Sequence, residues 1–299
     1  MLELQGPAFG QLRQTFGGDT LNTAVYLARC GGGRLRVHYA TALGDDSLSS
    51  GLLQRWAAEG VQTGLVQRLP GRLPGLYLIE LDPAGERRFH YWRAQAAARA
   101  YFDTATTPLE DQADALDALY LSGISLAILP TAGRERVLAL MARMRARGGL
   151  VAFDNNYRPR LWESLGDARY WYDRAFAAAS VALITADDHQ ALHGLPSLEA
   201  AVDAAQALPV GEVAIKRGAL PTLVGAEGRW QEVPTEIVAK VVDTTAAGDS
   251  FAAGYLGSRL QGLGQAEAAA FGNRLAARVI QHPGALIPRE AMQDLMPAP

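Results

Sequence analysis

The stretch DTTAAGDSFAAGYL, residues 243–256, decides the fold and the position of the site. Its small residues let the chain turn tightly into a helix that we expect over residues 247–260. Such a helix start leaves main-chain N–H groups unpaired, and together with the helix dipole they attract anionic oxygen. Asp249 falls in the first turn, beside whatever these groups bind. The stretch therefore predicts an anion site with one carboxylate, and the alternative is an ordinary acidic helix cap.

Strand-like and helical patterns alternate along most of the chain. We expect strands over 35–41, 119–122, 150–154, 181–185 and 213–216, and helices over 21–30, 47–59, 131–147, 247–260 and 265–280. Such alternation predicts an α/β fold, a mostly parallel sheet flanked by helices on both faces. The runs 75–82 and 87–93 interrupt it and flank the turn residues 83–86. They predict a β-hairpin that belongs to a small β appendage.

Polar residues follow several of the expected parallel strands. They are Ser122 with Gly123, the run 154–156, Thr185 and Lys216. Ligands of open α/β sheets bind beyond the carboxyl ends of the strands. We therefore expect the site at this edge of the sheet.

Three further segments contain groups suited to a polar ligand. The helix start 17–22 has N–H groups, Asp19 and Asn22 that can bind the hydroxyls of a ligand. The alternative is a flexible segment that leads into the helix, with Asp19 as an ordinary cap. In the hairpin strand, Tyr91 and Arg93 share one face and suit a carboxylate, whereas an exposed strand with a surface arginine is the alternative. The segment 154–162 carries Asn156 and two arginines that suit anionic oxygen, and its alternative is a proline-containing surface loop.

Composition excludes several classes of protein. The chain has 299 residues, 49% of them hydrophobic, which is enough for a large core, and a net charge of −3 that indicates neither nucleic-acid nor membrane partners. A single cysteine, Cys30, excludes an internal disulfide and fits a cytoplasmic location. The sequence has no P-loop motif and no dinucleotide fingerprint after a strand. His189 and His193 have helical spacing but no third ligand nearby, so we expect no protein-held metal.

The segments 17–24 and 243–251, which precede two of the expected helices, together resemble the PfkB (ribokinase-like) carbohydrate kinases. Gly17, Gly18, Asn22 and Ala24 are similar to the amino-terminal signature of that family, and 243–251 to its carboxy-terminal one. Within the family, the resemblance is closest to the branch that phosphorylates 2-keto-3-deoxygluconate. The stretches that carry it are GGDTLNTAVYLAR (17–29), GERRFHYWR (85–93), LYLSGISLAIL (119–129) and FDNNYRPRLW (153–162).

The resemblance implies a fold, a reaction and two small-molecule partners. The fold is ribokinase-like, a single domain over 1–299 with a small β-sheet lid formed by about 4–17 and 68–94. The reaction is ATP-dependent phosphorylation of 2-keto-3-deoxy-D-gluconate to 2-keto-3-deoxy-6-phosphogluconate, with Mg²⁺ carried by the nucleotide. Another PfkB sugar kinase, acting on fructose, ribose or a nucleoside, is the alternative. A non-catalytic relative is a third reading, although the presence of Asp249 argues against it.

The resemblance also implies a role for individual residues. Asp249 matches the catalytic base, and Ala246, Ala247 and Gly248 match the anion hole. The implied substrate contacts, besides Asp249, are Gly18, Asp19, Thr20, Leu21, Asn22, Tyr77, Tyr91, Trp92, Arg93 and Arg158. The implied ATP contacts are Asn156, Arg158, Lys216, Arg217, Gly218 and Thr245, with Ala246, Ala247 and Gly248. Because Asp249 lies at a helix N-terminus, we expect its pKa to be depressed.

The chain departs from the family pattern at three places. Ala246 replaces a glycine of the common Gly-Ala-Gly-Asp pattern, and 185–188 reads Thr-Ala-Asp-Asp where Asn-x-x-Glu is usual. Relatives also begin with an apolar strand that is central in the sheet, so we expect the start codon to lie upstream of Met1. An exposed lid sheet favours a homo-oligomer paired through the lid.

Overall fold

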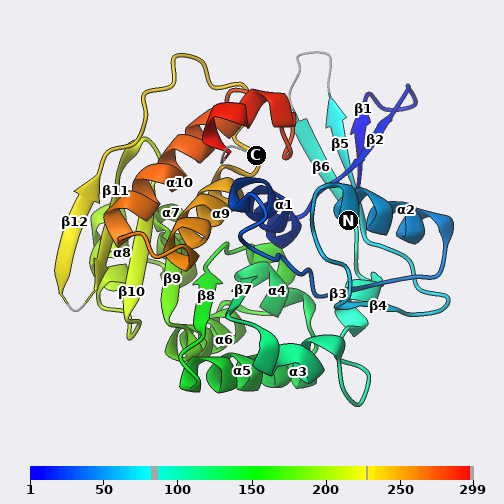
Figure 1. The fold of residues 1–299 in the computed structure, drawn as a ribbon, viewed down its shortest axis with the longest axis horizontal. Helices are drawn as coiled ribbons and strands as arrows, with labels where there is room; N and C mark the ends of the chain where they lie inside the picture. Colours follow the sequence, from blue (N-terminus) through cyan, green and yellow to red (C-terminus); the bar gives the residue numbers. More distant parts are fainter. Residues whose placement is uncertain (82–86, 227, 297–299) are drawn as a thin grey trace.

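The computed structural model describes residues 1–81, 87–226 and 228–296 (Figure 1). The α-helices are α1 Asp19–Gly31, α2 Ser47–Ala58, α3 Pro108–Gln112, α4 Gly123–Ile128, α5 Thr131–Ala146, α6 Leu165–Ala178, α7 Ala186–His193, α8 Leu198–Gln206, α9 Ala247–Leu260 and α10 Gln265–Val279. The strands are β1 Leu2–Gly6, β2 Arg13–Phe16, β3 Thr41–Leu43, β4 Val66–Arg68, β5 Leu76–Leu81, β6 Arg87–Trp92, β7 Ala118–Ser122, β8 Leu150–Asp154, β9 Val181–Thr185, β10 Glu212–Arg217, β11 Leu220–Ala226 and β12 Arg229–Val233.

The main sheet has six strands in the order β12-β11-β10-β9-β8-β7. Strands β7 to β10 run parallel, and β11 and β12 continue the sheet in antiparallel pairs. Successive side chains of each strand point to opposite faces of the sheet, and helices pack against the side chains on both faces. Phe153 packs with α4, α5 and α6, whereas Ala152 packs with α9 and α10. The α/β prediction is therefore confirmed.

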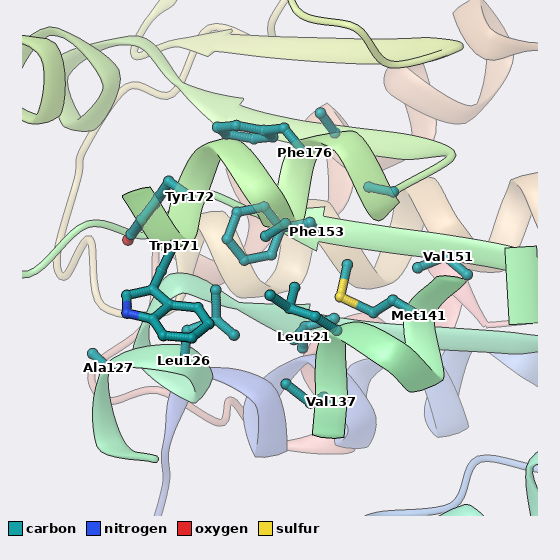
Figure 2. Packing of buried hydrophobic residues seen from close by; sticks show 14 of the residues in the cluster. Leu121, Leu126, Ala127, Val137, Met141, Val151, Phe153, Trp171, Tyr172 and Phe176 are labelled. Carbon is teal, nitrogen blue, oxygen red and sulfur yellow. The ribbon is translucent and has the colours of Figure 1, made fainter. Parts of the chain in front are cut away.

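The face that β7 and β8 turn toward α4–α6 carries the largest hydrophobic cluster (Figure 2). Phe153 lies 5.5 Å from the ring of Tyr172 and 5.1 Å from that of Phe176, both on α6. Met141 of α5 fills the neighbouring space and is fully buried. This packing holds the carboxyl ends of β7 and β8, and with them the polar residues that follow, in fixed positions.

The strand predicted over 35–41 is wrong in its boundaries. Residues 37–39 are joined to Gln62 by an isolated bridge, with Tyr39 N–H donating to the Gln62 carbonyl at 3.0 Å. Continuous pairing with β4 begins only at Thr41. The apolar alternation of Leu35, Val37 and Tyr39 reflects packing against the first helices, not a ladder of strand pairs.

A separate four-stranded sheet has the order β2-β1-β5-β6. The expected hairpin is present, with β5 and β6 antiparallel and Tyr77 opposite Tyr91. Its predicted turn at 83–86 lies outside the described residues. β1 joins β2 in antiparallel and β5 in parallel orientation, and Figure 1 shows this sheet beside the start of α1. The small β-sheet that was expected is thus present, while its action as a lid stays a prediction.

A cavity of about 1080 Å³ connects the two sheets and extends deep into the protein. It starts at the carboxyl ends of the parallel strands and reaches residues 34–43 and 115–121. Within the described residues, β7 pairs only with β8 and β3 only with β4. The strand expected to precede Met1 stays a prediction. In the part of the chain that the structure describes, no helix is both long and apolar enough to cross a membrane.

Candidate active site

The cavity between the two sheets gathers most of the residues that the sequence singled out. Its wall is formed by the starts of α1 and α9, the inner face of the small sheet and the ends of β8 and β10. The predicted site residues that line it are Gly18, Asp19, Thr20, Asn22, Tyr77, Tyr91, Arg93, Asn156, Arg158, Lys216, Thr245, Ala246, Ala247, Gly248 and Asp249. Residues more than 200 positions apart in the chain therefore face one space.

The start of α9 is a tight turn held by Asp243. Its carboxylate accepts hydrogen bonds from the N–H and the hydroxyl of Thr245, at 3.0 and 2.7 Å. Ala246 is the N-cap residue and has φ +62°, in the left-handed region that favours glycine. The N–H groups of Gly248 and Asp249 lie in the first turn, where no intrahelical acceptor exists. They form a helix start that faces the cavity and can bind anionic oxygen.

Asp249 is hydrogen-bonded to two residues in the first turns of α1. Asn22 Nδ2 donates to Asp249 Oδ2 at 2.8 Å, and Thr23 Oγ1 donates to the Asp249 carbonyl at 3.2 Å. Burial raises the pKa of Asp249 to about 8, the charge of Asp19 adds to this, and Asn22 and Lys216 oppose it. The expectation that the helix N-terminus depresses this pKa is wrong, because loss of water around the carboxylate outweighs the helix dipole.

Asp19 connects three elements at the floor of the cavity. Its Oδ2 accepts hydrogen bonds from the hydroxyl of Ser122 and from Asn156 Nδ2, the latter at 3.2 Å. Burial raises the pKa of Asp19, and the bond from Ser122 opposes that rise. The carboxylate thus joins the start of α1 to the ends of β7 and β8. Ser122 was predicted at the sheet edge, but no role was assigned to it.

The small sheet contributes aromatic rings and a guanidinium group. The rings of Tyr77 and Tyr91 lie 6.0 Å apart, and the Arg93 guanidinium lies 4.3 Å from the centre of the Tyr91 ring. The Tyr77 hydroxyl donates to Glu3 of β1. Sequence reasoning missed Glu3, because nothing in the local pattern marks its partner on β5. Phe89, Tyr91 and Arg93 all line the cavity, as the alternation of the strand predicted.

Two ion pairs occupy the opposite wall. Lys216 Nζ lies 2.9 Å from Asp154 Oδ2, and both side chains are largely buried. Arg158 Nη1 lies 3.1 Å from Asp188 Oδ2, with the arginine half exposed. Burial raises the pKa of Asp188, and Arg158 opposes that rise. Among the described residues, no group of three or more His, Cys, Asp or Glu side chains could hold a metal ion.

Four predicted contacts are not among the residues that line the cavity. Leu21 is fully buried in the core between α1 and α2, because it lies on the inner face of α1. Trp92 is 58% exposed on the other face of β6. Arg217 turns toward β11 and β12, where it pairs with Glu232 at 2.9 Å, and Gly218 forms the turn that follows it.

The fold and the site define an enzyme class: a kinase that transfers a phosphoryl group to a hydroxyl. The chain belongs to the pfkB family carbohydrate kinases, which it matches over residues 4–292. A 2-dehydro-3-deoxygluconokinase of Dickeya dadantii is 48% identical to it over 297 residues, which cover 98% of this chain and 96% of the relative. A protein of the same name from Haemophilus influenzae is 40% identical over 301 residues, covering 99% and 95%.

The fold also agrees with a solved structure. The PfkB protein from Polaromonas sp. JS666 has a TM-score of 0.83 and 27% identity, with 98% of this chain and 96% of that chain covered. This likeness confirms the ribokinase-like fold inferred from the motifs.

Proposed function

We propose that the protein phosphorylates 2-keto-3-deoxygluconate, also called 2-dehydro-3-deoxygluconate, at its 6-hydroxyl with ATP. One observation carries the proposal: Asp249 and Arg93 line the same cavity. A sugar acid has an alcohol at one end and a carboxylate at the other, and this cavity offers a base to the first and a cation to the second. Relatives 40–48% identical over nearly their full length are named for this substrate.

At the alcohol end, Asp249 orients the 6-hydroxyl and receives its proton. The hydroxyl oxygen bonds to the γ-phosphorus of ATP, the bond from that phosphorus to the bridging oxygen breaks, and ADP leaves. Since such transition states are loose, positioning and charge neutralisation matter more than a strong base. The first-turn N–H groups of Gly248 and Asp249 supply the donors for the transferred oxygens, since the N–H of Ala247 already donates to the Thr244 carbonyl at 3.2 Å.

At the acid end, Arg93 and Tyr91 hold the carboxylate. Guanidinium offers paired donors that match a carboxylate, and the Tyr91 ring keeps the Arg93 side chain in place at 4.3 Å. Asp19 and Asn156 lie between the two ends and suit the sugar hydroxyls. A neutral sugar would leave this half-buried guanidinium without an anionic partner, so the cavity favours an acid.

On the nucleotide side, Lys216, Arg158 and Thr245 face the phosphates. Mg²⁺ binds proteins through one or two carboxylates together with substrate phosphates, and Asp188 offers such a carboxylate to the cavity. Bound there with ATP, Mg²⁺ would neutralise the β- and γ-phosphate oxygens. We place the reaction in the cytoplasm, where ATP is available and the buried thiol of Cys30 stays reduced.

We further propose that two copies pair through the small sheet. Trp92 exposes 58% of its surface on the face of β6 that is turned away from the cavity, and β6 lies at the edge of the sheet among the described residues. An exposed edge strand with aromatic side chains is suited to pairing with a second copy. Sedimentation of the wild type and of Trp92→Glu tests this, because the substitution should shift a dimer to a monomer.

The function is tested by an ATP-consumption assay coupled to ADP release. The acceptors are 2-keto-3-deoxygluconate, its galacto epimer, gluconate, fructose and ribose. The proposal predicts that kcat/KM for 2-keto-3-deoxygluconate exceeds that for fructose and ribose by at least 100-fold. A preference for fructose or ribose would instead support the alternative of another sugar kinase in the family.

A further inference from the structure

Lys216 occupies an unusual position for a cation. Its Nζ lies at the first turn of α9, where a Cβ on Gly248 would be only 3.6 Å away, and 5.8 Å from the centre of the Phe251 ring. A helix N-terminus carries partial positive charge and repels cations. The side chain is only 12% exposed, so water screens little of this repulsion. A neighbouring group must therefore hold the ammonium there.

Asp154 is that group. Its Oδ2 accepts from Lys216 Nζ at 2.9 Å, and its Oδ1 accepts from the N–H of Asn156 at 3.1 Å. The carboxylate is 6% exposed and fixed at the end of β8, between Phe153 and the loop that carries Asn156 and Arg158. The charge of Lys216 also acts on the carboxylates of Asp188 and Asp249, where it opposes the rise in their pKa. Asp154 is thus the carboxylate bonded directly to the ammonium.

The sequence itself indicates that an ammonium is needed here. Of the 28 Lys and Arg residues, only Lys216 and Lys240 are lysines, and Lys240 is exposed. A chain that uses arginine almost everywhere else keeps a compact point charge at this buried position. A guanidinium is planar, wider and more weakly hydrated than an ammonium, so arginine is not an equivalent replacement for Lys216 beside Asp154 and Gly248.

We propose that Asp154 is a positioning residue that holds the Lys216 ammonium at the head of α9, facing the phosphoryl group during its transfer. The inference rests on the proposed function and deepens it. Negative charge on the migrating group adds an attraction for Lys216 during the transfer. Without Asp154, the ammonium is free to move toward Asp188 or Asp249, where it would neutralise the base instead of the phosphoryl oxygens.

The role is tested in the full-length protein with Asp154→Asn, Lys216→Met, Lys216→Arg and the Asp154→Asn/Lys216→Met double variant. Each single variant should lower kcat about 10- to 100-fold, the range for loss of one preorganised charged contact, with the KM for the sugar acid changed less than threefold. The double variant should be no slower than Lys216→Met, because Asp154 acts through the lysine. The ratio of the ATP and ADP dissociation constants should move toward one in every variant.

Two exposed positions provide matched controls. Lys240→Arg changes the other lysine, and Asp114→Asn removes a carboxylate that is 65% exposed in a surface ion pair. Both should retain wild-type kcat. Thermal unfolding of each variant identifies losses that come from misfolding.

The possible results separate the inference from the proposed function. Wild-type kcat in Asp154→Asn would overturn the positioning role. So would a loss of kcat in the double variant equal to the product of the losses in Asp154→Asn and Lys216→Met. A wild type without turnover on any sugar acid would overturn the proposed function. The ATP-to-ADP affinity ratio would then still test the inference, since it requires no acceptor.

Discussion

Asn22 Nδ2 lies 2.8 Å from Asp249 Oδ2, although 227 positions separate the two residues in the chain. The bond joins the starts of α1 and α9, so the two signatures of the family form one unit. It fixes one oxygen of the carboxylate and leaves Oδ1 without a bond from Asn22. Asn22 thus orients the base directly, beyond the substrate contact that the resemblance implied.

The first prediction concerns the pH dependence of turnover. Asp249 must be ionised to accept a proton, and burial raises its pKa to about 8. We therefore expect kcat/KM to rise with pH up to an apparent pKa near 8. Asn22→Ala removes a bond that lowers this pKa and should shift the rise to higher pH. Asp19→Asn removes a charge that raises it and should shift the rise to lower pH. Identical profiles in all three proteins would contradict the assignment.

The second prediction concerns stability. The pKa of Asp249 is higher in the folded protein than the ordinary 3.8, so the folded state binds the proton more tightly than the unfolded chain does. Its ionisation therefore reduces the free energy of unfolding as pH rises from about 4 to about 8, by at most ~1.4 kcal/mol per pH unit. Asp249→Asn removes this loss. Urea unfolding measures the free energy of unfolding of both proteins at pH 5 and pH 8.5. The difference, variant minus wild type, should be larger at pH 8.5 than at pH 5. An equal difference at the two pH values would refute the raised pKa.

The third prediction concerns substrate choice. Arg93→Ala removes the proposed partner of the carboxylate and should raise the KM for the sugar acid about 10- to 100-fold, as expected for a lost charged hydrogen bond. The KM for ATP should stay within twofold. Arg88→Ala is the matched control, because Arg88 lies on β6, just ahead of Arg93 in the chain, is exposed and points to the other face. An unchanged KM for the acid in Arg93→Ala would remove Arg93 from the site.

The fourth prediction concerns the turn before α9. Ala246 adopts φ +62°, a conformation that costs a residue with a Cβ about 1 kcal/mol relative to glycine. Ala246→Gly should therefore raise the free energy of unfolding by up to about 1 kcal/mol, less the entropy that glycine gains in the unfolded chain. Chemical denaturation measures the change. A loss of more than about 1 kcal/mol would show that the alanine methyl is needed for packing.

The fold was predictable because its signals are local. The strands over 150–154 and 181–185 and the helix over 247–260 have the predicted boundaries, since each strand is a buried apolar run and the helix starts at a distinctive turn. The strand over 35–41 was misplaced, because alternation reports which side chains are buried and not which backbone groups pair.

The site was predictable as a set of residues but not as a set of contacts. Polar residues at strand ends marked Asp154 and Ser122, yet their partners Lys216 and Asp19 lie 62 and 103 positions away. The pKa of Asp249 was misjudged for a related reason. Burial and the charge of Asp19 depend on tertiary structure, whereas the helix dipole can be inferred from the sequence alone.

The central claim is that Asp249, at the head of α9, directs a phosphoryl group onto the terminal hydroxyl of a sugar acid. Phosphorus NMR with proton coupling, applied to reactions of the wild type and Asp249→Asn with ATP and 2-keto-3-deoxygluconate, tests it most directly. The claim predicts a phosphate ester on the C6 methylene with the wild type, and none with the variant, which should still bind ATP with wild-type affinity. An ester on another carbon, or equal product from both proteins, would contradict it.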